Sequence, residues 1–353
     1  MNEDGVVTGL DPTKAVLSES ALHDKYLCDY VVNVATGCRH GCKFCYVPSS
    51  PQIRARAEML KEEADVDNPQ QEWGSYLLHR PKEKAEKLSG KLERKRKWKH
   101  TDGGRGIVAL SFSTDCYQDA HSAAVTRGCI KALSSHTRPD GEPIYTRILT
   151  RNPILASRDM DVYQEAGDRI TIGSSIPSLN NERVSIIEPK APLPEHRLNS
   201  LKEFNQAGVN TYISMSPTYP TQSREDIYDL FRAFSKADPD VVFHEPINHR
   251  GGNMNMLVEA AEEAGDEEFA DALQRITSRE EWIEYAVNQF RWVQEAAQDL
   301  DVPVHLWPDE ELLKHTSGDV HEWLSAWKSR ESVESFANRP SPDSSLPEIP
   351  NTS

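Results

Sequence analysis

Short runs of β-branched and apolar residues recur along the chain, and segments with helical periodicity separate them. Strands that alternate with helices in this way favour a parallel sheet covered by its own connecting helices. Six such runs in series suit a partial (β/α)6 TIM-like barrel better than a two-layer sandwich. The runs lie at 29–36, 106–113, 143–150, 169–177, 210–216 and 240–246. We therefore expect an α/β core barrel over residues 30–250.

The segments outside this alternation have their own patterns. The expected parts are a lead-in at 1–29, a basic insertion at about 49–104, a helical extension at 251–335 and a disordered tail at 336–353. Within the extension, Ser278 and Glu281 form a capping-box pattern that predicts the start of a helix. Residues 302–308 predict one more strand at the barrel edge. The tail is rich in Pro and Ser, a composition typical of disorder.

Three of the six cysteines lie within eight positions, as Cys38, Cys42 and Cys45. They follow the first predicted strand, at the edge where α/β barrels carry their chemistry. A structural zinc site usually has four ligands, whereas the remaining cysteines are scattered in the sequence. Three thiolates on a cuboidal iron–sulfur cluster would leave one iron open to a small ligand. The spacing therefore favours an open cluster, with zinc or unreactive thiols as the alternatives.

The pattern Cys-x3-Cys-x-aromatic-Cys, with Phe44 as the aromatic residue, resembles the radical S-adenosylmethionine (SAM) superfamily. Blocks at 112–121, 174–208 and 243–253 are similar to its spore photoproduct lyase-like branch, whose members are labelled DNA repair photolyases. The resemblance implies two cofactors, SAM and a 4Fe–4S cluster held by the three cysteines. It also implies a lyase-like enzyme that cleaves SAM reductively to a 5′-deoxyadenosyl radical, which abstracts hydrogen from a substrate. A nucleic-acid lesion is one candidate substrate. The alternative is a non-catalytic iron–sulfur binding or electron-transfer protein on the same scaffold.

The resemblance assigns SAM-binding roles to residues after the second predicted strand. Ser113, Thr114 and Asp115 would accept hydrogen bonds from the ammonium group of SAM. The alternative is an Asx or Ser/Thr turn that caps the next helix.

Further SAM contacts are implied at the end of the fourth predicted strand. Ser174 and Ser175 would hold the ribose hydroxyls, and Arg197 would pair with the methionine carboxylate. A surface ion pair of Arg197 with Glu195 or Glu203 is the other interpretation.

The chain departs from the branch just before this Ser-Thr-Asp turn, where the resemblance implies a hydrogen-donating cysteine and the sequence has Phe112. Cys116, and Tyr117 beside it, are therefore the catalytic candidates for hydrogen transfer. A small buried thiol is the alternative interpretation of Cys116.

The charge is unevenly distributed along the chain. The formal net charge is −16, yet residues 80–99 hold ten Lys or Arg against three Glu and include Trp98. Basic side chains beside an aromatic ring suit a phosphate backbone and a stacked base, so nucleic acid is a candidate partner at this run. We expect the run to emerge near the active face. A solvated amphipathic helix is the alternative.

The remaining expectations concern the reductant and the compartment. The resemblance implies an external one-electron reductant of the flavodoxin or ferredoxin type. The first residues are polar, and no stretch of about 18 apolar residues occurs in the sequence, so we expect a cytoplasmic protein without a membrane segment.

Overall fold

The main sheet contains all six predicted strands in chain order. In the computed structural model, which describes residues 5–20, 22, 27–99, 106–249, 252–330 and 346–350, this sheet has eight strands in the order β11-β10-β9-β8-β7-β6-β3-β2. The six are β3 (Tyr30–Val32), β6 (Gly106–Leu110), β7 (Ile144–Thr150), β8 (Ile170–Ser175), β9 (Asn210–Thr218) and β10 (Val241–Pro246), and adjacent members of this set are parallel to each other. At the edges, β11 (Val304–Leu306) is parallel to β10 and β2 (Ser18–Glu19) is antiparallel to β3. The predicted partial (β/α)6 barrel is confirmed, and the predicted extra strand is β11.

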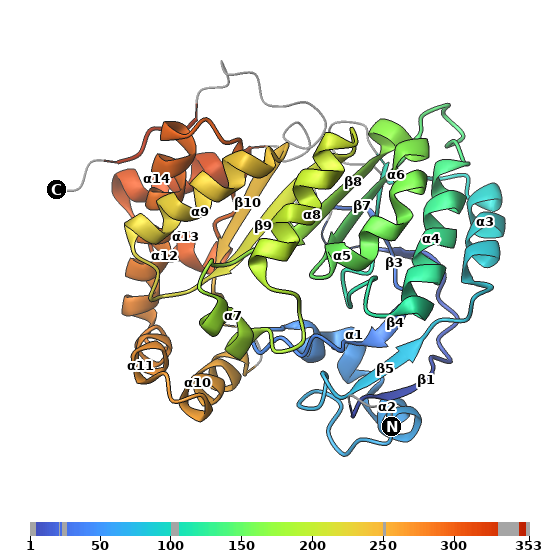
Figure 1. The fold of residues 1–353 in the computed structure, drawn as a ribbon, viewed down its shortest axis with the longest axis horizontal. Helices are drawn as coiled ribbons and strands as arrows, with labels where there is room; N and C mark the ends of the chain where they lie inside the picture. The colour runs from blue at the N-terminus through green and yellow to red at the C-terminus, as the bar shows by residue number, and fades with distance from the viewer. Residues whose placement is uncertain are drawn as a thin grey trace.

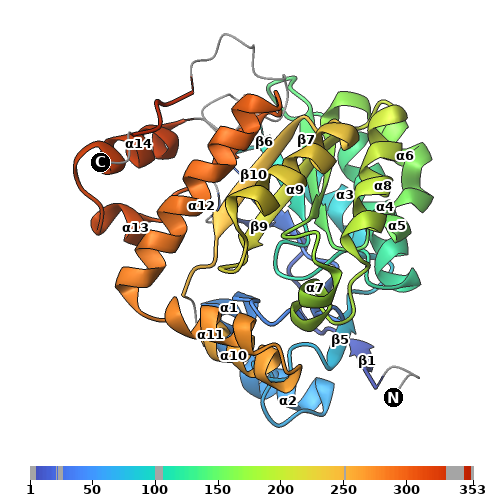
Figure 2. The same cartoon turned by 60° about the vertical axis from the view of Figure 1, so that its left-hand side comes forward.

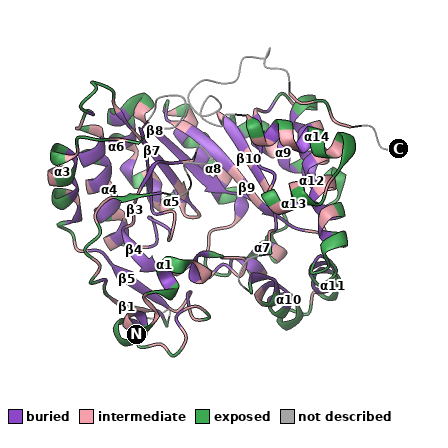
Figure 3. Cartoon of the chain, turned by 180° about the vertical axis from the view of Figure 1, so that it is seen from behind, coloured by how far each residue is buried: buried purple, intermediate pink, exposed green. Residues whose placement is uncertain are grey.

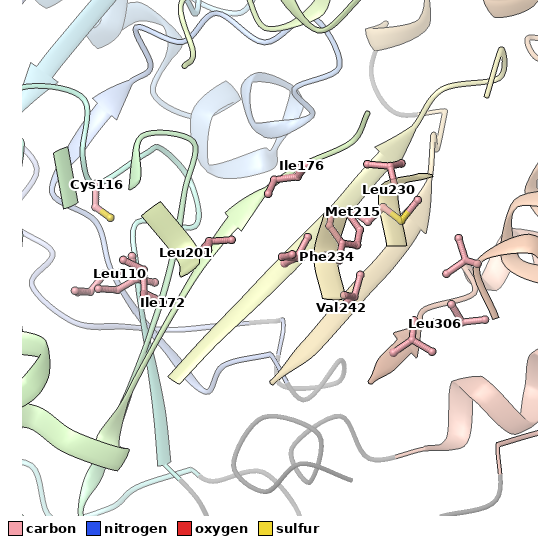
Figure 4. Packing of buried hydrophobic residues seen from close by; sticks show 14 of the residues in the cluster. Leu110, Cys116, Ile172, Ile176, Leu201, Met215, Leu230, Phe234, Val242 and Leu306 are labelled. Carbon is pink, nitrogen blue, oxygen red and sulfur yellow. The ribbon is translucent and has the colours of Figure 1, made fainter. Parts of the chain in front are cut away.

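Helices cover the outer face of this sheet (Figure 1). They are α3 (Lys84–Arg94), α4 (Ala120–Ser134), α5 (Pro153–Ala156), α6 (Met160–Ala166), α8 (Pro194–Gln206), α9 (Arg224–Ala237) and α12 (Arg279–Asp299). Alternate strand residues such as Leu110, Ile172 and Val242 pack against helix residues such as Leu201 and Phe234 (Figure 4). The strands are buried while the outer faces of the helices are exposed (Figure 3). This packing holds the strands in register, so their carboxyl ends meet at one edge.

The first predicted strand is two strands in the structure. After β3 the chain leaves the barrel, and β4 (Ala35–Gly37) pairs antiparallel with β5 (Tyr76–His79), which is parallel to β1 (Val7–Leu10). This small sheet lies beyond the carboxyl edge of the barrel strands, together with α1 (Pro51–Arg54) and α2 (Ala57–Ala64) (Figure 1). Residues 49–99 therefore contain α1, α2 and β5, which pack with the small sheet, and α3, which packs on the barrel helix α4.

The basic run does not lie where we expected. It begins beside the small sheet, where the Arg80 amide donates to the Val34 carbonyl, and continues along the outside of the barrel as α3, which packs against α4. At its end, Trp98 contacts the ring of Tyr30 at the amino end of β3. Its last residues thus lie at the edge opposite the cysteine loop. Arg80 and Lys84 of this run are buried, and they donate to the carbonyls of Thr13 and Ala15 respectively.

The chain after β10 forms a helical layer at the open side of the barrel (Figure 2). Its remaining elements are α10 (Asn253–Glu263), α11 (Glu267–Arg275), α13 (Glu310–Lys314) and α14 (Gly318–Ser329), and α7 (Asn181–Ile187) lies nearby after β8. Ser278 precedes α12 as predicted, but its side chain makes no capping hydrogen bond, so the predicted capping box does not form. Among the described residues, every helix is too short or too polar to span a bilayer.

Part of the predicted disordered tail is packed on this layer. Residues 336–345 and 351–353 lie outside the described residues, but Pro347 accepts a hydrogen bond of 2.6 Å from Nε2 of Gln294. Leu346 packs against the main core. Residues 346–350, within the segment that we expected to be a disordered tail, thus contact the helical layer and the core.

Candidate functional site

A cavity of about 350 Å³ opens at the carboxyl edge of the barrel strands. The cysteine loop and Trp73 form one wall, and the turn after β6 forms the next. Residues at the ends of β7, β8, β9 and β10 also line the cavity, among them Leu149, Arg151, Ser175, Ser214, Ser216, Glu245 and Asn248. The site therefore draws on nearly every barrel strand, as active sites of α/β barrels do.

The cysteine loop starts at a glycine that the fold requires. Gly37 has φ +87°, and a Cβ there would lie 2.2 Å from the carbonyl oxygen of Tyr76 on the paired strand β5. The next amide, that of Cys38, donates to the Trp73 carbonyl at 3.2 Å. Further along, the Lys43 amide donates to the Ile187 carbonyl at 2.9 Å. The loop is thus held from two sides by segments distant in sequence.

The three cysteines that sequence reasoning selected all line the cavity as free thiols. Burial raises the pKa of Cys38 and of Cys45 to about 12, and that of Cys42 further. A thiol binds metal as the thiolate, so metal binding here would release protons.

The thiols of Cys38, Cys42 and Cys45 are suitable ligands for an iron–sulfur cluster. No three His, Cys, Asp or Glu side chains among the described residues are grouped to hold a single metal ion. An iron–sulfur cluster does not need such convergence, because each thiolate binds a different iron. The other cysteines are elsewhere: Cys28 lies in a separate buried cluster, and Cys116 and Cys129 lie in the main core.

The turn after β6 faces the cysteine loop. Ser111 has φ +61°, and this left-handed residue redirects the chain so that Ser113, Thr114 and Asp115 line the cavity. The Thr114 hydroxyl donates to the Gly37 carbonyl, at the base of the cysteine loop. All three predicted residues are thus at the site.

Asp115 is already surrounded by donors from this chain. Its carboxylate accepts hydrogen bonds from the Tyr117 amide, the Thr150 hydroxyl and the Arg151 amide, and His40 Nε2 lies 3.2 Å from Oδ2. Burial opposes ionisation of Asp115, but His40 and these hydrogen bonds outweigh it and lower its pKa to about 2. Asp115 therefore ties the cysteine loop, its own turn and the end of β7 together.

The two serines at the end of β8 have opposite orientations. Ser175 lines the cavity, whereas Ser174 donates to the Thr150 carbonyl at 2.7 Å and does not line it. Successive residues of a strand point to opposite faces of the sheet, so only one of the pair can face the site. The Ser174 side chain, which we expected to hold a ribose hydroxyl, therefore lies outside the cavity lining.

Arg197 is fully buried and does not line the cavity. Its guanidinium pairs with Glu188 at 2.5 Å and donates to the carbonyls of Pro192 and Ser175. Neither the predicted contact with SAM nor the alternative surface ion pair is observed, because α8 directs this side chain into the core. The arginine at the cavity is Arg151, whose Nε lies 3.3 Å from the same Glu188 and whose guanidinium lies 4.9 Å from the ring centroid of Phe44.

Cys116 and Tyr117 are not in the cavity. Cys116 is completely buried in the main core, where burial raises its pKa well above the usual range (Figure 4). The Tyr117 hydroxyl donates to Asp159 at 2.9 Å and contacts the Tyr163 hydroxyl. Both catalytic candidates therefore lie outside the cavity lining, because the turn sends these side chains beneath α4 and α6.

Sequence reasoning missed several residues of the site. Arg151 and Glu245 each stand at the carboxyl end of a predicted strand, and that position alone is a signal for a functional residue in an α/β barrel. Trp73 lies in the segment between β4 and β5, where no motif marked it. His40 lies within the cysteine loop, and its contact with Asp115 depends on two turns that the sequence does not specify.

Comparison with known proteins agrees with this geometry. The sequence profile of the radical SAM superfamily matches residues 32–234. An uncharacterized protein of Acidianus two-tailed virus is 29% identical over 254 residues, which cover 70% of this chain and 77% of that protein. An uncharacterized protein of Methanocaldococcus jannaschii is 24% identical over 216 residues, which cover 61% of this chain and 68% of that protein.

Solved structures are similar in fold. A spore photoproduct lyase variant gives a TM-score of 0.54 at 11% identity, covering 85% of this chain and 81% of that chain. Another variant of the lyase, with bound AdoMet and dinucleoside spore photoproduct, gives 0.52 at 13% identity, covering 72% of this chain and 66% of that chain. This chain thus spans just under two thirds of the second lyase chain. Because the superfamily profile covers more than half of the sequence and includes all three cysteines of the cavity, the protein belongs to the radical SAM superfamily.

Proposed function

We propose that this protein is a radical SAM enzyme that holds its cluster on Cys38, Cys42 and Cys45 and cleaves SAM reductively. The superfamily uses a 4Fe–4S cluster and SAM, and these are also the cofactors of this protein. When bound, they supply a 5′-deoxyadenosyl radical able to abstract hydrogen. The observation that carries the proposal is that three free thiols share one cavity with polar groups from four neighbouring strands.

Residues of the cavity suit the parts of SAM. The Ser113 and Thr114 turn presents oxygen atoms beside the cysteine loop, where an ammonium group needs acceptors. Arg151 is the cation that would pair with the methionine carboxylate, and Glu188 positions it. Ser175 would hold a ribose hydroxyl. Asp115 acts by organising these groups, since its oxygens already accept hydrogen bonds from the chain.

The substrate proposal is a nucleic-acid lesion, with lyase-like chemistry. It is supported by the lyase structures of similar fold, one of which has a dinucleoside photoproduct bound. Phe112 lines the cavity where that branch would place a hydrogen-donating cysteine, so the hydrogen-transfer step must differ from that of the lyase.

An external one-electron reductant of the flavodoxin or ferredoxin type would supply the electron. The free cysteines suit a reducing compartment, which we propose is the cytoplasm.

A second candidate is a non-catalytic iron–sulfur protein on the same scaffold. The polar lining next to the thiols favours an enzyme, because electron transfer alone would not require room for a ligand beside the cluster.

Formation of 5′-deoxyadenosine tests the proposal. The anaerobically reconstituted protein is incubated with SAM and dithionite, and the products are separated by liquid chromatography. We expect 5′-deoxyadenosine and methionine in equal amounts, and neither product with the Cys42→Ser variant. A fully loaded cluster that leaves SAM intact would favour the non-catalytic alternative.

A further inference from the structure

A buried tryptophan of the cavity wall has a donor without an acceptor. Trp73 is 4% exposed, and its indole Nε1 makes no hydrogen bond with any described residue. Buried donors without a partner are rare in proteins, and each one requires an explanation. Leaving such a group unsatisfied costs about 1–3 kcal/mol. The indole N–H is therefore a candidate for an interaction with a group that binds in the cavity.

The position of Trp73 restricts what that group can be. Its side chain belongs to the same buried cluster as Cys38 and Cys45, and all three line the cavity. Its carbonyl accepts the hydrogen bond from the Cys38 amide. Backbone and side chain of Trp73 thus both lie against the cysteine loop.

The surroundings hold the indole ring in place. The ring of Tyr76 packs edge-on against it, with centroids 5.6 Å apart. The adjacent Gly74 approaches Gly41 so closely that a Cβ on Gly74 would lie 2.8 Å from the Gly41 Cα. The donor is therefore fixed relative to the cysteine loop before any cofactor binds.

Hydrogen bonds to the sulfur atoms of an iron–sulfur cluster raise its reduction potential, because they stabilise the additional negative charge of the reduced form. An N–H is a stronger donor than any C–H of the apolar residues around it. A single donor in a buried site is consequently enough to change how readily the cluster accepts an electron.

We propose that the indole N–H of Trp73 donates a hydrogen bond to a sulfur of the 4Fe–4S cluster and raises its reduction potential. The inference rests on the proposed function, since it requires the cluster to occupy this cavity. Trp73 is then a residue that tunes the one-electron transfer from the external reductant. It does not bind iron and does not contribute to SAM cleavage in any other way.

The test is a redox titration of the reconstituted protein without SAM, in which the reduced cluster is measured by electron paramagnetic resonance. Trp73→Phe removes the N–H and retains an aromatic ring. We expect about a tenfold lower ratio of reduced to oxidised cluster at a fixed solution potential, which corresponds to a shift of about 59 mV to more negative potential for one electron. Iron content and far-ultraviolet circular dichroism of the same samples check that the variant folds and holds its cluster.

A matched control is available in Trp98, whose indole Nε1 is also buried with no partner among the described residues but lies at the amino edge of the barrel. Trp98→Phe should leave the potential unchanged. Benzothienylalanine at position 73 keeps the bicyclic shape and lacks only the N–H, so it should reproduce the effect of Trp73→Phe even if phenylalanine loosens the packing.

The outcomes separate the two proposals. Should the wild-type protein hold no cluster, the proposed function fails. Should it hold a cluster whose potential is the same with tryptophan, phenylalanine or benzothienylalanine at position 73, the role of Trp73 is refuted and the proposed function stands. An unchanged potential combined with weaker SAM binding would also refute it, because the indole would then donate to SAM.

Discussion

At the residue scale, the candidate cluster ligands and the candidate SAM ligands differ in how each side chain comes to face the cavity. The cysteines could be predicted because their spacing is itself the motif, and all three reach the cavity. Arg197 and Ser174 could not be placed correctly, because the direction of each side chain depends on the phase of its helix or strand. In both cases a neighbour, Arg151 or Ser175, lines the cavity instead.

The two arginines on Glu188 lead to a prediction that separates binding from stability. Arg151→Ala should weaken SAM binding about ten- to a hundredfold, because a charge-assisted hydrogen bond is lost. Arg197→Ala should instead reduce the free energy of unfolding by about 3–5 kcal/mol, because it removes a buried cation that pairs with Glu188. Equilibrium binding of SAM and denaturant unfolding measure the two effects. If Arg197→Ala were stable and defective only in SAM binding, our assignment of the two arginines would be reversed.

At the element scale, the strands and outer helices followed from the alternation of patterns, but the small sheet did not. The break between β3 and β4 falls at Asn33 and Val34, and a single polar residue within an otherwise apolar run does not distinguish two strands from one. The pairing of β4 with β5 joins residues about forty positions apart. Long-range pairing of this kind places the cysteine loop, and local sequence signals do not encode it.

Gly37 should be essential for this arrangement. Gly37→Ala places a Cβ against the Tyr76 carbonyl and forces a positive φ on alanine, so we expect β4 to separate from β5 and the protein to retain little iron. Gly141→Ala is the matched control, since Gly141 has φ +89° and no atom within 4 Å of the added Cβ. That variant should lose only about 1 kcal/mol of stability and keep its cluster. Iron analysis after reconstitution compares the two, and equal iron content would contradict the role of Gly37.

Two buried histidines on adjacent strands make stability depend on pH. Burial lowers the pKa of His244 to about 4 and that of His305 to about 3. In the unfolded chain both histidines bind a proton near pH 6.5. Their contribution to the free energy of unfolding is therefore fully present above pH 6.5 and is lost as the pH falls. Each histidine should contribute a slope of about 1.4 kcal/mol per pH unit between pH 6.5 and about 4.

Denaturant unfolding across that pH range measures the slope. His305→Phe should reduce it by about half, because His305 packs against Phe243 and Trp327 and an aromatic ring fits there. His196→Gln, at an exposed position, should leave it unchanged. A slope that His305→Phe does not alter would mean that other groups cause the acid sensitivity.

At the scale of the whole molecule, the barrel and the small sheet together form a cavity lined by three thiols. The barrel could be predicted from the sequence, whereas the small sheet and the course of the basic run could not. Those features depend on contacts such as that of Trp98 with Tyr30, which join distant segments. The family assignment agrees with the cavity and does not depend on the basic run.

The most direct test is the iron and sulfide content of reconstituted single-cysteine variants. Wild type should hold about four irons and four sulfides per chain, as should Cys28→Ser, Cys116→Ser and Cys129→Ser. Each of Cys38→Ser, Cys42→Ser and Cys45→Ser should lose most of this iron and the brown colour. A colourless wild-type protein with one tightly bound zinc, or a cluster that survives loss of any one of those three thiols, would contradict the account.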